Sequence, residues 1–297
     1  MIGGNIKRGI IMVVLLIVAS WVLAATKVLS QGRFAKNMAK TPSDALLFNG
    51  LIFGTGAIVL LPIFGVNVAL SGIFAGFLVG LFNVIFQMAY VCAFSCGPVS
   101  LTAMISTTSM VVPIIVSAIA YKEPLSVFRT IGIILTIVAL YFTTEKIKKD
   151  SIKLKWALFT LLSFVANFSS SLTQKIYLKN FPETDTSSFV SVHFAFAAIL
   201  SLGLYFILSA CGKKCSYKIG KNVIFTSIFI GVVLGIFNLI YSYALANIDA
   251  TVYLPVFNGG LTILVTLCGS LFMKERLTNR QKISIVLGVF AIVLMSL

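Results

Sequence analysis

Polar side chains at helical spacing within long apolar segments are the residues of this sequence that could do chemistry. Asn83, Gln87 and Tyr90 lie at positions i, i+4 and i+7, on one face of a helix. Four more apolar segments carry a similar polar face, and such faces would enclose a hydrogen-bonding cavity. The candidate substrate-binding residues are Trp21, Lys27, Asn83, Gln87, Tyr90, Ser106, Asn167, Ser171, Gln174, Lys175, Asn238, Tyr241 and Asn258. The alternative is that these Ser, Thr and Asn residues join helices to one another.

The ionisable residues inside the apolar segments are all basic, namely Lys27, Lys175 and His193. The two lysines would either attract a carboxylate or phosphate of a substrate or extend their ammonium groups to the lipid head groups. His193 is interpreted as a proton-coupling group or as a hydrogen-bonded interior residue. The 8 acidic residues all lie at segment ends or in connections. This argues against exchange of protons for lipophilic cations at a carboxylate within the membrane.

The composition explains where these residues lie. Of the 297 residues, 59% are apolar and only 10% are charged, whereas a soluble protein has about 25% charged residues. A membrane helix needs about 20 apolar residues, and long unbroken apolar runs are unlike the alternating strands of a membrane barrel. The sequence therefore predicts an all-α integral membrane protein. The net charge of +15 is attributed to loops that face anionic lipids, not to nucleic acid binding.

Apolar runs separated by charged or turn-forming residues predict ten transmembrane helices. They lie near residues 9–29, 45–65, 69–94, 98–121, 126–144, 154–178, 187–210, 221–245, 249–273 and 280–297. The longest polar connection, 145–155, divides the chain into a first five-helix repeat, 1–146, and a second, 147–297.

The two halves resemble one another in sequence. Residues 76–86 match residues 231–241, with five of eleven positions identical. Lys122-Glu123 matches Lys274-Glu275, and Lys27 matches Lys175, in the same order and at similar offsets. With five helices in each copy, the second copy enters the bilayer from the opposite side. We therefore expect two inverted five-helix repeats around a central cavity, an architecture that secondary transporters use.

The sequence resembles the ten-helix EamA-like branch of the drug/metabolite transporter superfamily. The resemblance covers nearly the whole chain and rests on its length, its five-plus-five organisation and three segments. These are Trp21…Lys27, the hairpin at 93–98 and the Glu-Arg-Leu-Thr-Asn-Arg-Gln segment at 275–281, whose counterpart after Glu123 lacks the Gln. The resemblance implies carrier-mediated movement of small metabolites, often export, without ATP hydrolysis. The sequence agrees, because it contains no phosphate-binding GxxxxGK[ST] motif.

The leading hypothesis is a secondary-active exporter or exchanger in the cell (cytoplasmic) membrane that works by alternating access. The substrate is expected to be a small polar metabolite, amino-acid-like or otherwise zwitterionic or anionic. The lipid bilayer is the other expected partner, and a coupling proton or ion and a monomeric or homodimeric state are left open. We expect no enzymatic activity, catalytic residue, cofactor or metal site, since one His and scattered cysteines suit zinc poorly.

Two other functions stay open. The first is efflux of drugs or quaternary amines through aromatic contacts. The second, from another class, is a non-transporting membrane protein such as a lipid scramblase or an assembly subunit. The orientation is also open: the Lys and Arg count places both termini outside, whereas relatives of the family commonly have them inside.

Overall fold

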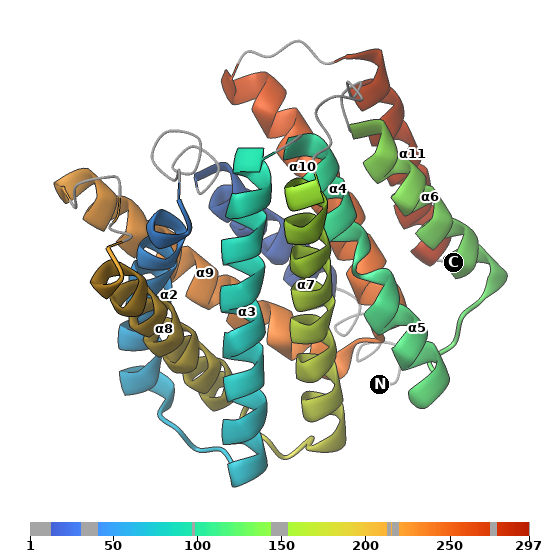
Figure 1. Ribbon diagram of the computed structural model, residues 1–297. Helices are drawn as coiled ribbons and strands as arrows, with labels where there is room; N and C mark the ends of the chain where they lie inside the picture. Colours follow the sequence, from blue (N-terminus) through green and yellow to red (C-terminus); the bar gives the residue numbers. More distant parts are fainter. Residues whose placement is uncertain are drawn as a thin grey trace.

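The computed structural model describes residues 13–30, 41–96, 99–143, 154–212, 215, 220–273 and 278–296. In these ranges the regular secondary structure is helical, with short turns between the helices (Figure 1). The first helix spans Val13–Ser30. The helices that follow are α2 (Pro42–Phe64), α3 (Leu70–Cys96), α4 (Val99–Thr108), α5 (Val111–Ala120), α6 (Val127–Thr143), α7 (Leu154–Asn180), α8 (Thr186–Ala210), α9 (Lys221–Asn247), α10 (Ala250–Met273) and α11 (Asn279–Ser296).

Successive crossings run in alternating directions through the bundle, with α4 and α5 together forming one crossing (Figure 1). Six of the described helices are long and apolar enough to cross a membrane, including the first helix. Shorter apolar stretches cover Ile105–Ala120, Val127–Phe142 and Ala250–Val265. The predicted all-helical, multi-pass membrane fold is confirmed.

The break between α4 and α5 has a local cause in the sequence. Pro113 lacks the backbone N–H, and its ring would clash with the carbonyl of Ser109, four residues earlier, in a continuous helix. The helix stops at Thr108 and restarts at Val111. Pro255 lies within α10, which continues without interruption. The break therefore belongs to one repeat only.

Helices that correspond between the two halves pack against each other. The second helix of each half forms the α2–α8 contact, and the fifth forms the α6–α11 contact. Helices near a two-fold axis contact their own counterparts in this way, so the packing is consistent with two inverted repeats. The third helix of the first half, α3, packs between α7 and α8.

Glycines bring α3 close to α8. A Cβ added at Gly80 would lie 2.9 Å from the backbone nitrogen of Ala197, and one at Gly76 would lie 2.8 Å from Val192 Cγ1. In the second half, a Cβ at Gly231 would lie 2.6 Å from the Ile52 carbonyl oxygen. Small residues at this spacing allow two membrane helices to approach closely. Gly76 and Gly80 thus allow α3 to lie close to α8.

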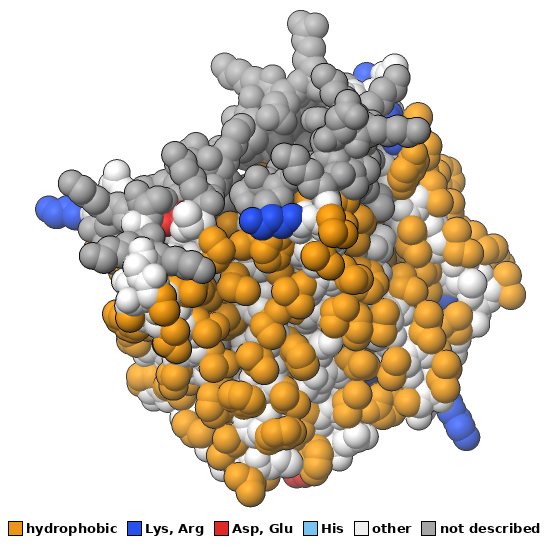
Figure 2. All heavy atoms as spheres, viewed as in Figure 1, with side chains coloured by type: hydrophobic (Ala, Val, Ile, Leu, Met, Phe, Trp, Pro, Cys, Tyr) orange, Lys and Arg blue, Asp and Glu red, His pale blue; other side chains and the backbone are white. Residues whose placement is uncertain are grey.

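The outer face is apolar, while polar side chains lie in the interior. Figure 2 shows hydrophobic side chains over most of the visible face, with basic side chains at its margins. Leu70, Phe206 and Ile119 are among the exposed apolar residues, whereas Gln174, Ser242 and Asn238 are buried. This distribution suits a bilayer, where apolar atoms face lipid and polar groups need partners inside the protein.

Candidate functional site

A cavity of about 200 Å³ lies between the first helix and helices α3, α7, α9 and α10. The candidate residues that line it are Lys27, Asn83, Gln87, Asn167, Ser171, Gln174, Asn238, Tyr241 and Asn258. The remaining candidates, Trp21, Tyr90, Ser106 and Lys175, do not line it. The structure thus brings together side chains from both halves of the sequence, and their role in substrate binding stays a prediction.

Helix α7 is tied to the broken α4–α5 crossing by amide and hydroxyl groups. Asn167 Nδ2 donates to the carbonyl of Ser106 and to Ser109 Oγ, both at 2.9 Å. Ser106 Oγ shares a hydrogen bond of 2.8 Å with Ser163 Oγ, behind the cavity wall. Ser106, a candidate substrate-binding residue, therefore joins α4 to α7. Because Ser109 lies where the helix is interrupted, Asn167 also reinforces the break.

The same helix is bonded to α3 on one side and to α9 on the other. Ser170 Oγ donates to Asn83 Oδ1 at 3.1 Å. On the opposite side, Ser242 Oγ donates to Gln174 Oε1 at 3.0 Å. These bonds join the amide groups of Asn83 and Gln174 to hydroxyl groups on a neighbouring helix.

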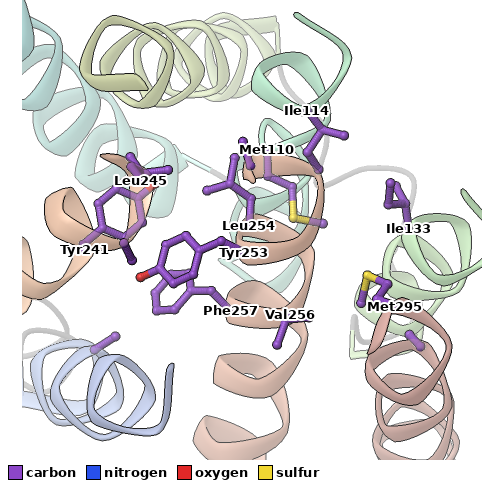
Figure 3. Close-up of a cluster of buried hydrophobic side chains, with 14 of the residues drawn as sticks. Met110, Ile114, Ile133, Tyr241, Leu245, Tyr253, Leu254, Val256, Phe257 and Met295 are labelled. Carbon is purple, nitrogen blue, oxygen red and sulfur yellow. The ribbon is translucent and has the colours of Figure 1, made fainter. Parts of the chain in front are cut away.

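Aromatic rings from α9 and α10 form another wall of the cavity (Figure 3). The ring centroids of Tyr241 and Phe257 are 5.7 Å apart, and those of Tyr241 and Tyr253 are 5.6 Å apart. The Tyr241 hydroxyl shares a hydrogen bond of 3.2 Å with Ser171 Oγ on α7. Together with the bond between Ser242 and Gln174, this contact links α7 to α9 through polar side chains.

Two asparagines leave their amide oxygens without a protein donor among the described residues. Asn238 Nδ2 donates to the Leu234 carbonyl at 3.0 Å, and Asn258 Nδ2 donates to the Leu254 carbonyl at 2.8 Å. A backbone carbonyl only accepts, so each amide must turn its nitrogen to its own helix. Both side chains line the cavity. Their Oδ1 atoms are therefore acceptors for a bound solute or water.

Lys27 is the only charged residue among the described residues that line the cavity. Within the described ranges its ammonium has no ion-pair partner. An ammonium that faces a cavity without a carboxylate attracts an anion. The cavity therefore combines one cation with amide and hydroxyl groups.

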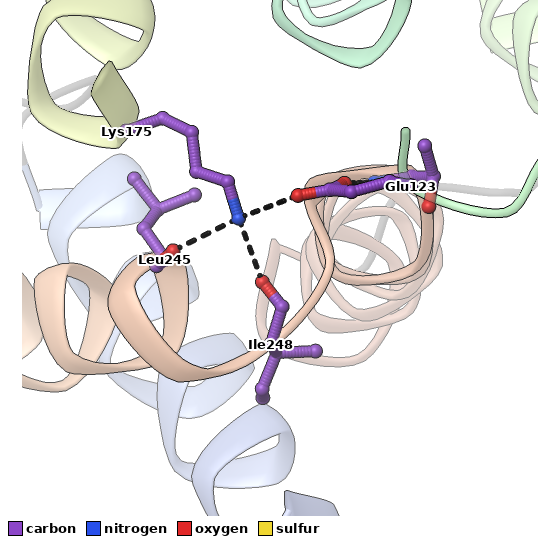
Figure 4. A network of polar contacts seen from close by, with 5 residues as sticks. Glu123, Lys175, Leu245 and Ile248 are labelled. Carbon is purple, nitrogen blue, oxygen red and sulfur yellow. Dashed lines mark hydrogen bonds and ion pairs between the residues drawn. The ribbon is translucent and has the colours of Figure 1, made fainter. Parts of the chain in front are cut away.

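Lys175, the repeat counterpart of Lys27, is buried in the protein interior, and Figure 4 shows its polar contacts. Its Nζ lies 2.9 Å from Glu123 Oε1 and donates to the carbonyls of Leu245 and Ile248 at 3.1 and 3.0 Å. These three acceptors match the three donors of an ammonium group. Only 1% of the Lys175 side chain is exposed. In this structure Lys175 therefore neither lines the cavity nor reaches the outer surface of the protein.

The ends of two helices stabilise this buried ion pair. Leu245 and Ile248 lie at the C-terminal end of α9, where the helix dipole favours a cation. The other oxygen of Glu123, Oε2, accepts a hydrogen bond of 3.2 Å from the backbone nitrogen of Thr251, in the first turn of α10. A carboxylate is favoured at that end. The pair thus joins α7 and the segment after α5 to the α9–α10 turn.

The remaining candidates make contacts within the protein but do not themselves line the cavity. Trp21 Nε1 donates to the Phe257 carbonyl at 3.1 Å, and its indole occupies the space that a Cβ at Gly260 would need. Tyr90 packs against Phe86, with ring centroids 5.2 Å apart. His193 is fully buried against the rings of its own helix and does not line the cavity.

Glu123 is the residue that the sequence reasoning missed. It lies between α5 and α6, where a loop carboxylate is expected to face water, yet only 6% of the residue is exposed. Its position in the repeated Lys-Glu motif was the signal that could have drawn attention to it. Glu275, in the second copy of that motif, lies outside the described residues. The described residues contain no group of three or more His, Cys, Asp or Glu that could hold a metal ion.

Comparisons with known proteins identify the architecture. No curated protein matches the chain. A solved structure whose title says only "Crystal structure of protein" is similar over 95% of this chain and 96% of its own, with a TM-score of 0.75 and 13% sequence identity. That likeness shows the fold. The model of the EamA-like transporter family matches residues 9–145 and again residues 154–297. Because the two matches cover nearly the whole sequence, the chain belongs to the EamA-like transporter family, within the drug/metabolite transporter superfamily.

Proposed function

We propose that this transporter carries a small zwitterionic or anionic metabolite, amino-acid-like in its charged groups, by alternating access. It acts as a secondary-active exporter or exchanger in the cytoplasmic membrane. The observation that supports this proposal is Lys27, which lines the cavity without a carboxylate partner among the described residues. A charged group in the bundle interior that lines a cavity is a candidate functional residue.

The other charged end of the substrate is assigned to the asparagines. Asn238 and Asn258 offer amide oxygens, which accept hydrogen bonds from a protonated amine. A substrate carboxylate would lie at Lys27 and its ammonium near these oxygens. The apolar lining residues Leu254, Phe257 and Leu261 would then contact a side chain of moderate size. The volume of about 200 Å³ lies below the roughly 300–1,000 Å³ of sites for drug-sized ligands.

The proposal is tested with three solutes of the same shape. L-leucine carries both charges, 4-methylpentanoate only the carboxylate and 3-methylbutylamine only the ammonium. Binding is measured by thermal stabilisation of the purified protein, since a ligand at a hundred times its Kd stabilises the folded state by about 2.7 kcal/mol. We expect leucine to bind best, and the acid to bind to the wild type but about tenfold more weakly to Lys27→Met. Exchange of labelled leucine in proteoliposomes then tests transport.

Lys179→Met is the matched control for this experiment. Lys179 is an exposed lysine near the end of α7, outside the cavity, so its loss should leave the binding of all three solutes unchanged. Equal binding of 4-methylpentanoate to the wild type and to Lys27→Met would contradict the proposed anion site.

Efflux of drugs or quaternary amines is the second candidate function, because Phe237, Tyr241 and Phe257 line the cavity with aromatic rings. Such rings attract an organic cation. Stabilisation by 3-methylbutylamine and by tetraethylammonium, without stabilisation by leucine or the acid, would favour this function instead.

A further inference from the structure

The ion pair of Lys175 and Glu123 lies one helical turn beyond the cavity. Gln174, next to Lys175, lines the cavity, and so do Tyr241, one turn before Leu245, and Leu254, one turn after Thr251. The pair therefore lies at the end of the cavity where α5 and α9 end, α7 approaches its end and α10 begins (Figure 1). Any opening of the cavity toward this end must separate segments that the pair joins.

The contacts of the pair are long-range in sequence. They connect α7 to the segment after α5 and to both sides of the α9–α10 turn, and each contact includes at least one charged atom (Figure 4). A buried ion pair of this kind is costly to break within protein, because each partner left alone is an uncompensated charge. If this end opens, water reaches both groups and that cost falls. The ion pair thus favours the arrangement in which this end of the cavity is closed, and it can separate only when water reaches both charged groups.

We propose that the Lys175–Glu123 ion pair holds this end of the cavity closed, and that Lys175, released from Glu123, becomes the anion-binding group when this end opens. This proposal rests on the proposed function in taking Lys27 as the anion-binding group of the state seen here. Lys175 is the repeat counterpart of Lys27 at an offset of 148 residues. Two inverted repeats that exchange roles would present the two lysines to the substrate in turn.

The closure is tested by measuring a distance across this end. Spin labels are placed at Ile119→Cys on α5 and Asn247→Cys on α9, both exposed positions, in a protein whose native cysteines are replaced. Double electron–electron resonance then gives the distance distribution in the otherwise unaltered protein and in Glu123→Gln. We expect Glu123→Gln to add a population at longer distance. An unchanged distribution in folded Glu123→Gln would overturn the closure.

Two matched variants separate the ion pair from general charge effects. Asp249→Asn removes a carboxylate from the α9–α10 turn, and Lys179→Met removes a lysine from the last turn of α7; neither side chain belongs to the ion pair. Both should keep the wild-type distribution. If Glu123→Gln fails to fold, Glu123→Asp keeps the charge but shortens the side chain, and we expect a smaller shift in the same direction. An unchanged distribution in Glu123→Asp would then overturn the closure.

The release of Lys175 is tested by recovery of anion binding. Lys27→Met should weaken the binding of 4-methylpentanoate about tenfold, which corresponds to about 1.4 kcal/mol. In Lys27→Met/Glu123→Gln, Lys175 has lost its carboxylate partner, so at least half of that loss in binding free energy should return. Adding Lys175→Met to the double variant should abolish the recovery. A double variant that binds as weakly as Lys27→Met would overturn the second half of the proposal.

The outcomes for the two proposals are distinguishable. Unchanged binding of 4-methylpentanoate to Lys27→Met would refute Lys27 as the anion site, and with it the exchange of roles between the lysines. The spin-label distances would still decide whether the ion pair closes this end.

Discussion

Lys27 and Lys175 occupy matching positions in the two repeats, yet their surroundings differ completely. Lys27 lines the cavity with no ion-pair partner among the described residues, whereas Lys175 has a carboxylate and two carbonyls around its ammonium. The position of each lysine in its repeat does not explain this difference, because both lie within the last two turns of the first helix of their repeat. The difference arises from what the neighbouring helices place beside them.

This asymmetry is informative because counterpart helices of the two repeats pack against each other. The α2–α8 and α6–α11 contacts join counterpart helices, as an inverted pair of repeats requires. A transporter whose halves were in identical conformations would have equal access from both sides. Different surroundings for the two lysines are therefore what a single access state would show. Each prediction below either removes this difference or makes it measurable.

The largest expected effect is on stability, and it should separate the two lysines. Lys175→Met leaves Glu123 buried without its cation, and breaking a buried pair in this way costs about 3–5 kcal/mol. Lys27→Met removes no contact of this kind and should cost less than about 1 kcal/mol. Thermal unfolding of both variants in the same detergent measures the difference. Equal losses would mean that the ion pair contributes no more than an exposed one.

The second effect compares glycines that match between the repeats. Gly80→Ala forces a methyl group within 2.9 Å of the Ala197 backbone nitrogen, so α3 and α8 must separate, at a cost of about 1–3 kcal/mol. Its counterpart Gly235 has only the Leu60 side chain nearby, 3.5 Å from an added Cβ. Gly235→Ala should be neutral or stabilising by up to about 1 kcal/mol, since Ala favours helix over Gly. A loss in Gly235→Ala as large as that in Gly80→Ala would show that α9 and α2 pack more tightly than this structure has them.

The sequence predicts the helical membrane fold because long apolar runs leave few alternatives in a bilayer. It predicts the fourth crossing as one helix near 98–121, whereas the structure interrupts that helix between Thr108 and Val111, close to Pro113. The sequence predicts much less about which side chains line the cavity together. Tyr90 lies on the same helix face as Asn83 and packs against Phe86, but unlike these two residues it does not line the cavity. Lys27 follows Trp21 at an offset of six positions, which turns the two side chains to different faces of one helix.

Glu123 shows why the rest could not be predicted. Its burial depends on the ends of α9 and α10, more than a hundred residues later in the chain, which provide a cation site and an N–H donor side by side. A loop position with a carboxylate does not contain that information. Only the repeated Lys-Glu motif hinted that the residue was more than a solvated loop charge.

The smallest expected effect concerns the asparagine oxygens and tests whether the second half of the chain supplies the amine site. Asn258→Leu removes an acceptor from the cavity and should weaken the binding of 3-methylbutylamine about fivefold, the equivalent of about 1 kcal/mol for one hydrogen bond. Binding of 4-methylpentanoate should not change. Asn247→Leu is the control, because Asn247 makes the same bond to its own helix, to the Tyr243 carbonyl at 2.8 Å, but does not line the cavity. If the acid lost affinity in Asn258→Leu while the amine did not, the two charged ends of the substrate would have to be reversed.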